Sequence, residues 1–162
     1  MRSIEETRIL LDLIDLSFLR RTGVALPVPP GVPDRYDWLH REAPYSLLSH
    51  DTAADPVFTY VNEMALHSFG YGYSEMLSLP SRLSAGPADQ AERNRLLAQV
   101  RQNGIAFNYE GLRRTKNGNT FQIYDGIIWV VEDQERKVIG QAALFWPTDA
   151  LRPDWWNIPG PK

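Results

Sequence analysis

The three histidines are the first residues to consider for metal binding or proton transfer. They stand at His40, His50 and His67, and no two of them have the spacing that turns both imidazoles to one side of a helix. The chain contains no cysteine, which rules out thiolate metal sites, cysteine nucleophiles and cysteinyl adducts with a chromophore. We therefore expect neither a zinc site nor a haem site.

Proton transfer without a metal is a second chemistry that the composition permits. His67 or Asp125 could act as the base in an apolar cavity, with Tyr60, Tyr109 or Tyr124 as the hydrogen-bond donor. Nothing in the spacing of these residues selects among them. A small cupped α+β enzyme of the isomerase or hydratase type therefore stays an alternative.

Length and charge point to one soluble globular domain. The 162 residues are 43% hydrophobic and 23% charged, which is enough apolar material for a single core. The 17 lysines and arginines face 20 aspartates and glutamates, and a net charge of -3 gives no positive field for a nucleic acid. The apolar runs are far shorter than a membrane span, and the first residues turn acidic where a signal peptide turns apolar. We expect a cytoplasmic protein with no nucleic-acid and no membrane partner.

The N-terminal segment, residues 1–23, has the pattern of an amphipathic helix. Ser3 and Glu6 form a capping box and Gly23 is a helix stop, which predicts a helix over about residues 4 to 21. Its apolar face is wider than one contact with a sheet requires. We expect the helix either to pack on its own domain alone or to pair also with a second copy in a homodimer.

Prolines separate this helix from the rest of the chain. We assign residues 24–44 to a Pro-rich linker with a short helix, 45–147 to the main domain and 148–162 to a Trp-rich C-terminal tail. Trp155 and Trp156 in the tail are expected to pack over the sheet, or to anchor a partner.

The main domain has the element order of an α+β fold. Two short runs of β-formers precede three short helices, and three longer alternating segments follow. Asn117-Gly118 predicts a tight hairpin between the first two of the longer segments. The expected strands are 45–49, 57–61, 105–110, 120–132 and 138–146, and the expected helices are 62–69, 75–78 and one from Pro87 to Gly104. This order predicts one five-stranded antiparallel sheet.

Several short motifs in this order resemble a PAS domain. The front half is carried by the run from Asp55 to Leu66, then by Phe69-Gly70-Tyr71 and Ser74-Glu75-Met76-Leu77. The back half is carried by the hairpin around Lys116-Asn117-Gly118 and by Val138-Ile139-Gly140. The stretches 79–84 and 140–145 resemble more specifically the MEKHLA type, a PAS-related domain found alone in bacteria and at the end of certain plant transcription factors.

The resemblance implies a PAS-like fold in which a five-stranded sheet, with helices on one face, curls around a small hollow. PAS proteins hold a ligand or cofactor in that hollow and signal its presence. The alternating faces of the predicted strands are consistent with such a lining.

Flavin is the cofactor that the resemblance brings forward, because the light-sensing branch of the PAS family binds it. Ser81 stands where that branch has its reactive cysteine, so a flavin-cysteinyl adduct is excluded. Arg113 and Ile123 stand at the positions of two flavin-binding asparagines. Of the flavin-binding positions, only that of the phosphate-binding arginine has the same residue type here, namely Arg82. The cofactor stays unknown, with flavin disfavoured.

The predicted ligand-binding residues are those that the resemblance places around the hollow. They are Phe69, Arg82, Phe107, Tyr109, Arg113, Ile123, Asp125, Trp129 and Gln141. The alignment puts 107, 109, 111 and 113 on one face with 123, 125, 127 and 129. An inward Arg113 would bind a carboxylate or phosphate. It could instead pair with Asp125 or turn to water, depending on the strand register.

The leading hypothesis is a stand-alone PAS-like sensory or ligand-binding module. It would hold an unidentified small molecule and signal through protein-protein contacts, with a homodimer through the N-terminal helix and a separate signalling protein as partners. Besides the enzyme, a purely structural interaction domain whose hollow is filled by its own side chains stays open.

Overall fold

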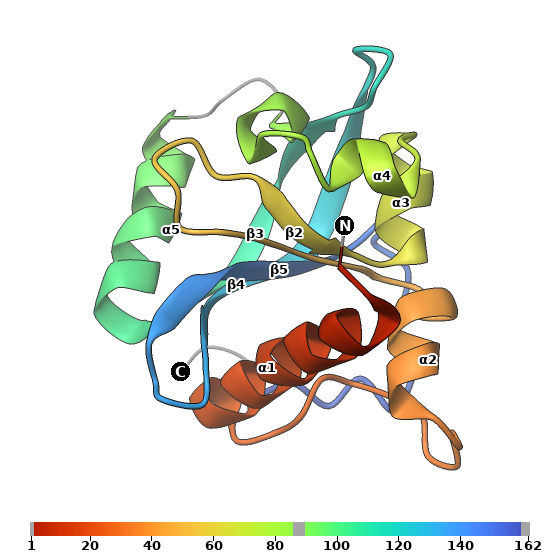
Figure 1. The fold of residues 1–162 in the computed structure, drawn as a ribbon. Helices are drawn as coiled ribbons and strands as arrows, with labels where there is room; N and C mark the ends of the chain where they lie inside the picture. The colour runs from red at the N-terminus through yellow and green to blue at the C-terminus, as the bar shows by residue number, and fades with distance from the viewer. Residues whose placement is uncertain (1, 86–89, 160–162) are drawn as a thin grey trace.

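The computed structural model describes residues 2–85 and 90–159, which form one antiparallel sheet with helices on both faces (Figure 1). The spatial strand order is β2-β1-β5-β4-β3. The strands are β1 (Ser46–His50), β2 (Phe58–Val61), β3 (Ile105–Arg114), β4 (Thr120–Glu132) and β5 (Val138–Trp146). The helices are α1 (Ile4–Thr22), α2 (Arg35–Arg41), α3 (Glu63–Phe69), α4 (Tyr73–Met76), the 3-10 turn η1 (Ser81–Ser84) and α5 (Gln90–Asn103). The predicted α+β fold with five antiparallel strands is confirmed.

The ends of α1 and α3 and the end of α5 follow the expected local signals, whereas α4 begins at Tyr73, two residues before the expected start at 75. Ser3 accepts a hydrogen bond from the Glu6 amide at 3.1 Å and Glu6 returns one to the Ser3 amide at 3.2 Å, so the predicted capping box is present. Gly23 ends α1 in the left-handed region, with φ +83°. Asn62 caps α3 and Gly104 follows α5. The predicted start of α5 at Pro87 lies outside the described residues.

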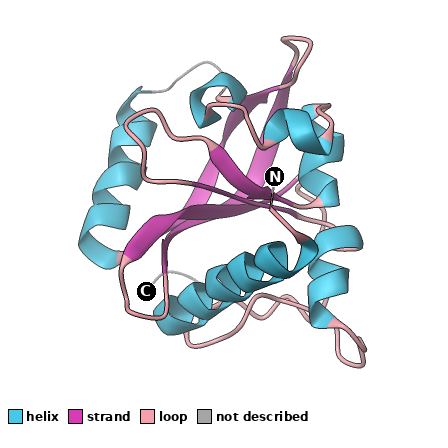
Figure 2. Cartoon of the chain, viewed as in Figure 1, coloured by secondary structure: helices cyan, strands magenta, loops and turns pink. Residues whose placement is uncertain are grey.

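One face of the sheet, called the outer face here, is covered by α1, α2 and the C-terminal segment. In Figure 2 the longest helix crosses this side of the sheet and a second, shorter helix stands at its end. Leu11, Ile14 and Phe18 of α1 are fully buried against Trp129 and its neighbours on β4. The face of α1 that the sequence assigns to a sheet therefore has the expected contact.

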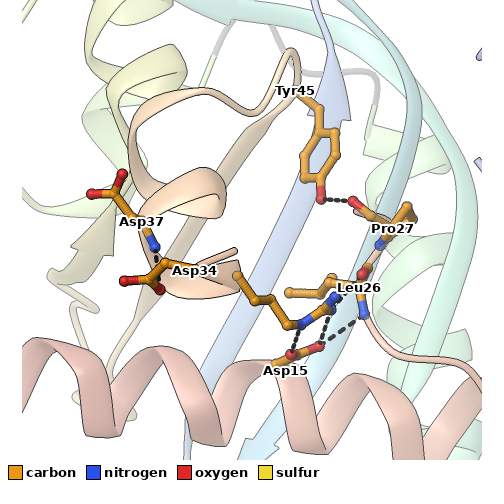
Figure 3. A network of polar contacts seen from close by, with 7 residues as sticks. Asp15, Leu26, Pro27, Asp34, Asp37 and Tyr45 are labelled. Carbon is orange, nitrogen blue, oxygen red and sulfur yellow. Dashed lines mark hydrogen bonds and ion pairs between the residues drawn. The ribbon is translucent and has the colours of Figure 1, made fainter. Parts of the chain in front are cut away.

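The Pro-rich segment is fixed to this outer layer by polar contacts (Figure 3). Asp15 of α1 accepts hydrogen bonds from the Leu26 amide at 2.8 Å and from Arg35 Nε at 2.8 Å. The buried Tyr45 hydroxyl donates to the carbonyl of Pro27 at 2.6 Å. These bonds hold α2 beside α1 across a stretch that has no regular structure of its own.

The opposite face, called the inner face here, is covered by α3, α4, η1 and α5. Val61, Ala65, Phe69 and Met76 pack there with Ile123 of β4 and Phe145 of β5, and all are buried. Leu96 and Val100 of α5 pack against Ala106 at the start of β3.

Two bulges interrupt the ladder between β3, β4 and β5. Asn108 on β3 has φ +59° and Asp125 on β4 has φ +52°, and the register shifts beside both residues. A bulge adds one residue to a strand and so exchanges the faces beyond it. Each of these two strands therefore turns different sides to the helices in its two halves.

None of the helices in the described part of the chain combines the length and the apolar character that a membrane span requires.

Candidate functional site

The space between the inner face and its helices is filled largely by apolar side chains. The Phe69 ring meets Phe121 edge-on at 5.1 Å between centroids and Phe145 at 6.1 Å. Met76 and Ile123 beside them are fully buried. This cluster gives the inner face an apolar surface that is packed by its own side chains.

Polar groups border this cluster at the hairpin end of the sheet. The Arg113 guanidinium lies over the Tyr109 ring at 4.9 Å from its centroid, and Arg113 pairs through its backbone with Ala85. The hydroxyl of Thr115 is buried without a hydrogen-bond partner among the described residues. Phe69, Tyr109, Arg113 and Ile123 of the predicted ligand set therefore do come together here.

The prediction that all the β3 and β4 residues of the set share one face is wrong. Trp129 lies on the outer face, where its Nε1 donates to the carbonyl of Ile14 at 3.1 Å and its ring meets Phe18 at 4.9 Å. Phe107 packs against the same outer cluster. The cause is the pair of left-handed residues, Asn108 and Asp125, which exchange the faces of the two strands.

Asp125 pairs with a residue other than Arg113, which the sequence analysis considered as its partner. Its Oδ2 accepts a hydrogen bond from Nε of Arg152 in the C-terminal segment at 2.9 Å and forms an ion pair with Nη2 of the same guanidinium at 2.8 Å. The alternative in which Asp125 pairs with Arg113 across the strands is therefore wrong. Arg113 stays half-buried on the inner face, as the ligand hypothesis requires.

Two further predicted residues lie apart from this group. The Arg82 side chain is 62% exposed and pairs with Asp55 at 3.1 Å. Gln141 is half-buried between His50 of β1 and Val130 of β4. Whether any residue of the set contacts a ligand stays a prediction.

The residues on the inner face do not fit a flavin. The resemblance to PAS domains places Ser81 at the position of the reactive cysteine, and it places Ile123, which is fully buried and has an apolar side chain, at the position of a ring-binding amide. Arg82 is turned to Asp55 at the surface rather than inward. The edge of a flavin ring needs hydrogen-bond donors and acceptors from the protein, and at this position it would meet apolar side chains instead.

A half-buried histidine and a fully buried tyrosine form a pair that the sequence patterns did not single out. His40 Nδ1 of α2 lies 3.0 Å from the Tyr60 hydroxyl of β2, and Tyr36 and Tyr73 flank the imidazole. Burial lowers the pKa of His40 and raises the pKa of Tyr60 well above its usual value. The hydroxyl therefore keeps its proton beside the imidazole, and the two groups share one hydrogen bond. The two residues are far apart in sequence and no local motif links them.

The region that forms the sheet and its helices can be compared with models of known domain families. A family model described as the MEKHLA domain matches residues 9–148. The chain belongs to the MEKHLA domain family. The matched region begins within α1 and reaches past β5, so the MEKHLA match includes the outer helices as well as the sheet.

Solved structures share the PAS fold with this MEKHLA domain. A PAS domain from Colwellia psychrerythraea is 13% identical, with 70% of this chain and 93% of that chain covered and a TM-score of 0.59. A light-oxygen-voltage domain of a blue-light activated histidine kinase from Erythrobacter litoralis is 22% identical, with 64% and 95% covered and a TM-score of 0.53. Another light-oxygen-voltage domain, solved in work on a flavin analogue, is 21% identical, with 64% and 77% covered and a TM-score of 0.53. No match was found among curated proteins.

Proposed function

We propose that this MEKHLA domain is a sensory module that holds a small anionic molecule against the inner face and passes its state to α1 through β4. The proposal extends to this chain the sensory role of its light-oxygen-voltage neighbours, with a ligand other than flavin. The polar border at Tyr109, Arg113 and Thr115 is the site that we assign to the ligand.

Arg113 supports an anion as the ligand. Its guanidinium stacks on the Tyr109 ring, which holds it in a fixed position at the edge of the apolar cluster. A planar guanidinium can bind a carboxylate or a phosphate through two parallel hydrogen bonds. The apolar part of the ligand would rest on Phe69 and Ile123.

The observation that carries the signalling part is that β4 is shared by both layers. Its residues Ile123 and Val130 contact the inner helices, while Trp129, which lies between these two positions, donates a hydrogen bond to the α1 backbone. The Glu132 amide donates to Ser17 of α1 at 3.0 Å. A shift of β4 that follows ligand binding would therefore move the groups to which α1 is bonded.

The partner that we propose for the signal is a second copy of the chain, bound through α1. The helix buries one side on the sheet and leaves an apolar stripe on the other, which includes Ile9, Leu16 and Leu19 with exposures of 51%, 37% and 40%. A stripe of this kind can pair with itself across a twofold axis. A separate signalling protein would then bind to the homodimer and respond to its state.

Native mass spectrometry of the freshly purified full chain tests the ligand proposal. We expect a non-covalent mass excess that disappears in Arg113→Ala, because the anion loses its bidentate partner. Arg114→Ala is the matched control, since Arg114 is the exposed neighbour on the same strand and should leave the mass excess unchanged.

The second candidate is an interaction domain without a ligand. It is favoured by the complete burial of Phe69, Met76 and Phe145, which fill most of the inner layer themselves. A wild-type spectrum with no mass excess would support this candidate against the sensory module.

A further inference from the structure

We propose that the outer face carries a second small-molecule site, on the opposite side of the sheet from the ligand site proposed above. It is a pocket for a neutral six-membered ring that presents an amide N–H beside a carbonyl group, as pyrimidine bases and ring carboxamides do.

The pocket lies where the two bulges meet the C-terminal segment. It has a volume of about 130 Å³ and is walled by the apolar side chains of Phe107, Ile127 and Trp156, with Asn108 and Asp125 as its polar groups. A cavity of roughly 150 Å³ is enough to hold benzene in another protein. The pocket therefore matches a single aromatic ring with small substituents.

Both polar groups stand on strained backbone. Asn108 and Asp125 are two of the three residues other than glycine with positive φ in the described chain, and they come from neighbouring strands. Such conformations are unfavourable for residues with a Cβ atom and concentrate at binding sites. Here both of them bring a polar side chain to one pocket.

Arg152 holds the carboxylate of Asp125 in place and compensates its negative charge. Arg152 donates to its Oδ2, and Arg152 is itself fixed by the carbonyls of Thr148 and Ala150, each at 2.8 Å, and by the Trp146 ring at 4.3 Å. No described residue donates to Oδ1. This oxygen can accept an N–H from a ligand that carries no charge of its own.

The amide of Asn108 completes the recognition. Its side chain makes no hydrogen bond with the described residues and can donate to a ligand carbonyl. An acceptor and a donor that line the same pocket fit the N–H and C=O of an amide, whether that amide is part of a ring or a substituent on it. Trp156 offers a flat wall beside them and is itself braced by Trp146 at 5.2 Å and Tyr45 at 5.8 Å.

Two-dimensional amide NMR of the full chain, with uracil and nicotinamide as separate probes, tests this site. We expect shifts concentrated at residues 107–108, 125–127 and 156, with a dissociation constant on the order of 1 mM or below, as ligands of this size permit. Benzoate, a ring of similar size with a charge and no N–H, should bind more weakly, because Asp125 Oδ1 would face another carboxylate oxygen.

Variants separate the site from general effects on the fold. Asn108→Gly relaxes the left-handed backbone and removes the amide, and should weaken uracil binding roughly fivefold or more. Arg136→Gly makes the same backbone change at φ +67° away from the pocket and should leave binding unchanged. Absence of localised shifts, or wild-type affinity in Asn108→Gly, would overturn the proposal. Arg113→Ala should leave uracil binding intact, so this result is independent of the inner-face ligand.

Discussion

At the scale of single residues, Asn62 joins three elements through one side chain. It is fully buried, accepts from the amides of Ala65 at 3.0 Å and Leu47 at 3.1 Å, and donates to the carbonyls of Leu39 at 3.1 Å and Tyr45 at 3.0 Å. The amide thus uses its full capacity for donation and ties α3, β1 and the end of α2 together.

Asn62→Ala should therefore be strongly destabilising. Four buried backbone groups would lose their partner, and we expect the free energy of unfolding to fall by about 3 kcal/mol. Denaturant unfolding of the full chain measures this change in the free energy of unfolding. Asn103→Ala, at an exposed position near the end of α5, should change it by less than about 0.5 kcal/mol. Equal effects of the two variants would contradict this role for Asn62.

His40 makes the stability of the domain depend on pH. Because its pKa is lowered by burial in the folded chain, the unfolded chain takes up a proton first as the pH falls below about 6.5, and folding becomes less favourable. We expect the thermal midpoint to drop between pH 7.5 and pH 5.5 in the wild type and to drop less in His40→Gln. His67→Gln, an exposed histidine on α3, should behave as the wild type. A pH profile unchanged by His40→Gln would show that this imidazole is not responsible.

At the scale of elements, the bulges on β3 and β4 decide which residues meet. Gly126 sits opposite Tyr109, and a Cβ atom there would lie 2.6 Å from the Tyr109 carbonyl oxygen. Gly111, further along the same pair of strands, has its nearest such contact at 3.6 Å, which is an ordinary distance.

Gly126→Ala should accordingly cost roughly 2 kcal/mol of unfolding free energy, because backbone has to move to admit the methyl group. Gly111→Ala should be neutral or slightly stabilising, since it only reduces the freedom of the unfolded chain. Chemical denaturation of both variants tests the geometry of the bulge. A neutral Gly126→Ala would mean that β3 and β4 lie further apart than described.

Helix ends and the hairpin could be predicted from the sequence because their signals are local. The capping box of Ser3 and Glu6, the cap that Asn62 places on Ala65 and the turn at Gly118 each involve residues at most four apart, and each has its expected role. The bulges could not be predicted in this way. Asn108 falls inside a segment that alternates regularly, and the extra residue shows only in the pairing with β4.

The candidate site was predictable in part for the same reason. Phe69, Tyr109, Arg113 and Ile123 follow from the order of motifs, and they do lie together. Phe107 and Trp129 were placed on the wrong face because one added residue reverses the alternation beyond it. Arg152, the partner of Asp125, lies in an irregular segment that has no pattern to read.

At the scale of the whole molecule, α1 connects the sheet to the proposed second copy. Leu16→Glu would put a charge in its exposed apolar stripe, and we expect it to shift the molecular mass in light scattering from that of a dimer toward that of a monomer. Leu97→Glu on α5, where the leucine is 39% exposed, is the matched control and should leave the mass unchanged. A monomeric wild type, or a dimer insensitive to Leu16→Glu, would contradict pairing through α1.

Amide hydrogen exchange tests most directly whether the inner face and α1 are coupled through β4. The full chain as purified would be compared with the same chain after unfolding, removal of small molecules and refolding. We predict that removal raises exchange at the inner-face strands and also in α1 around residues 14–18, where Trp129 and Glu132 are bonded. Identical exchange in both samples, or a change confined to α3, α4 and α5, would contradict the account.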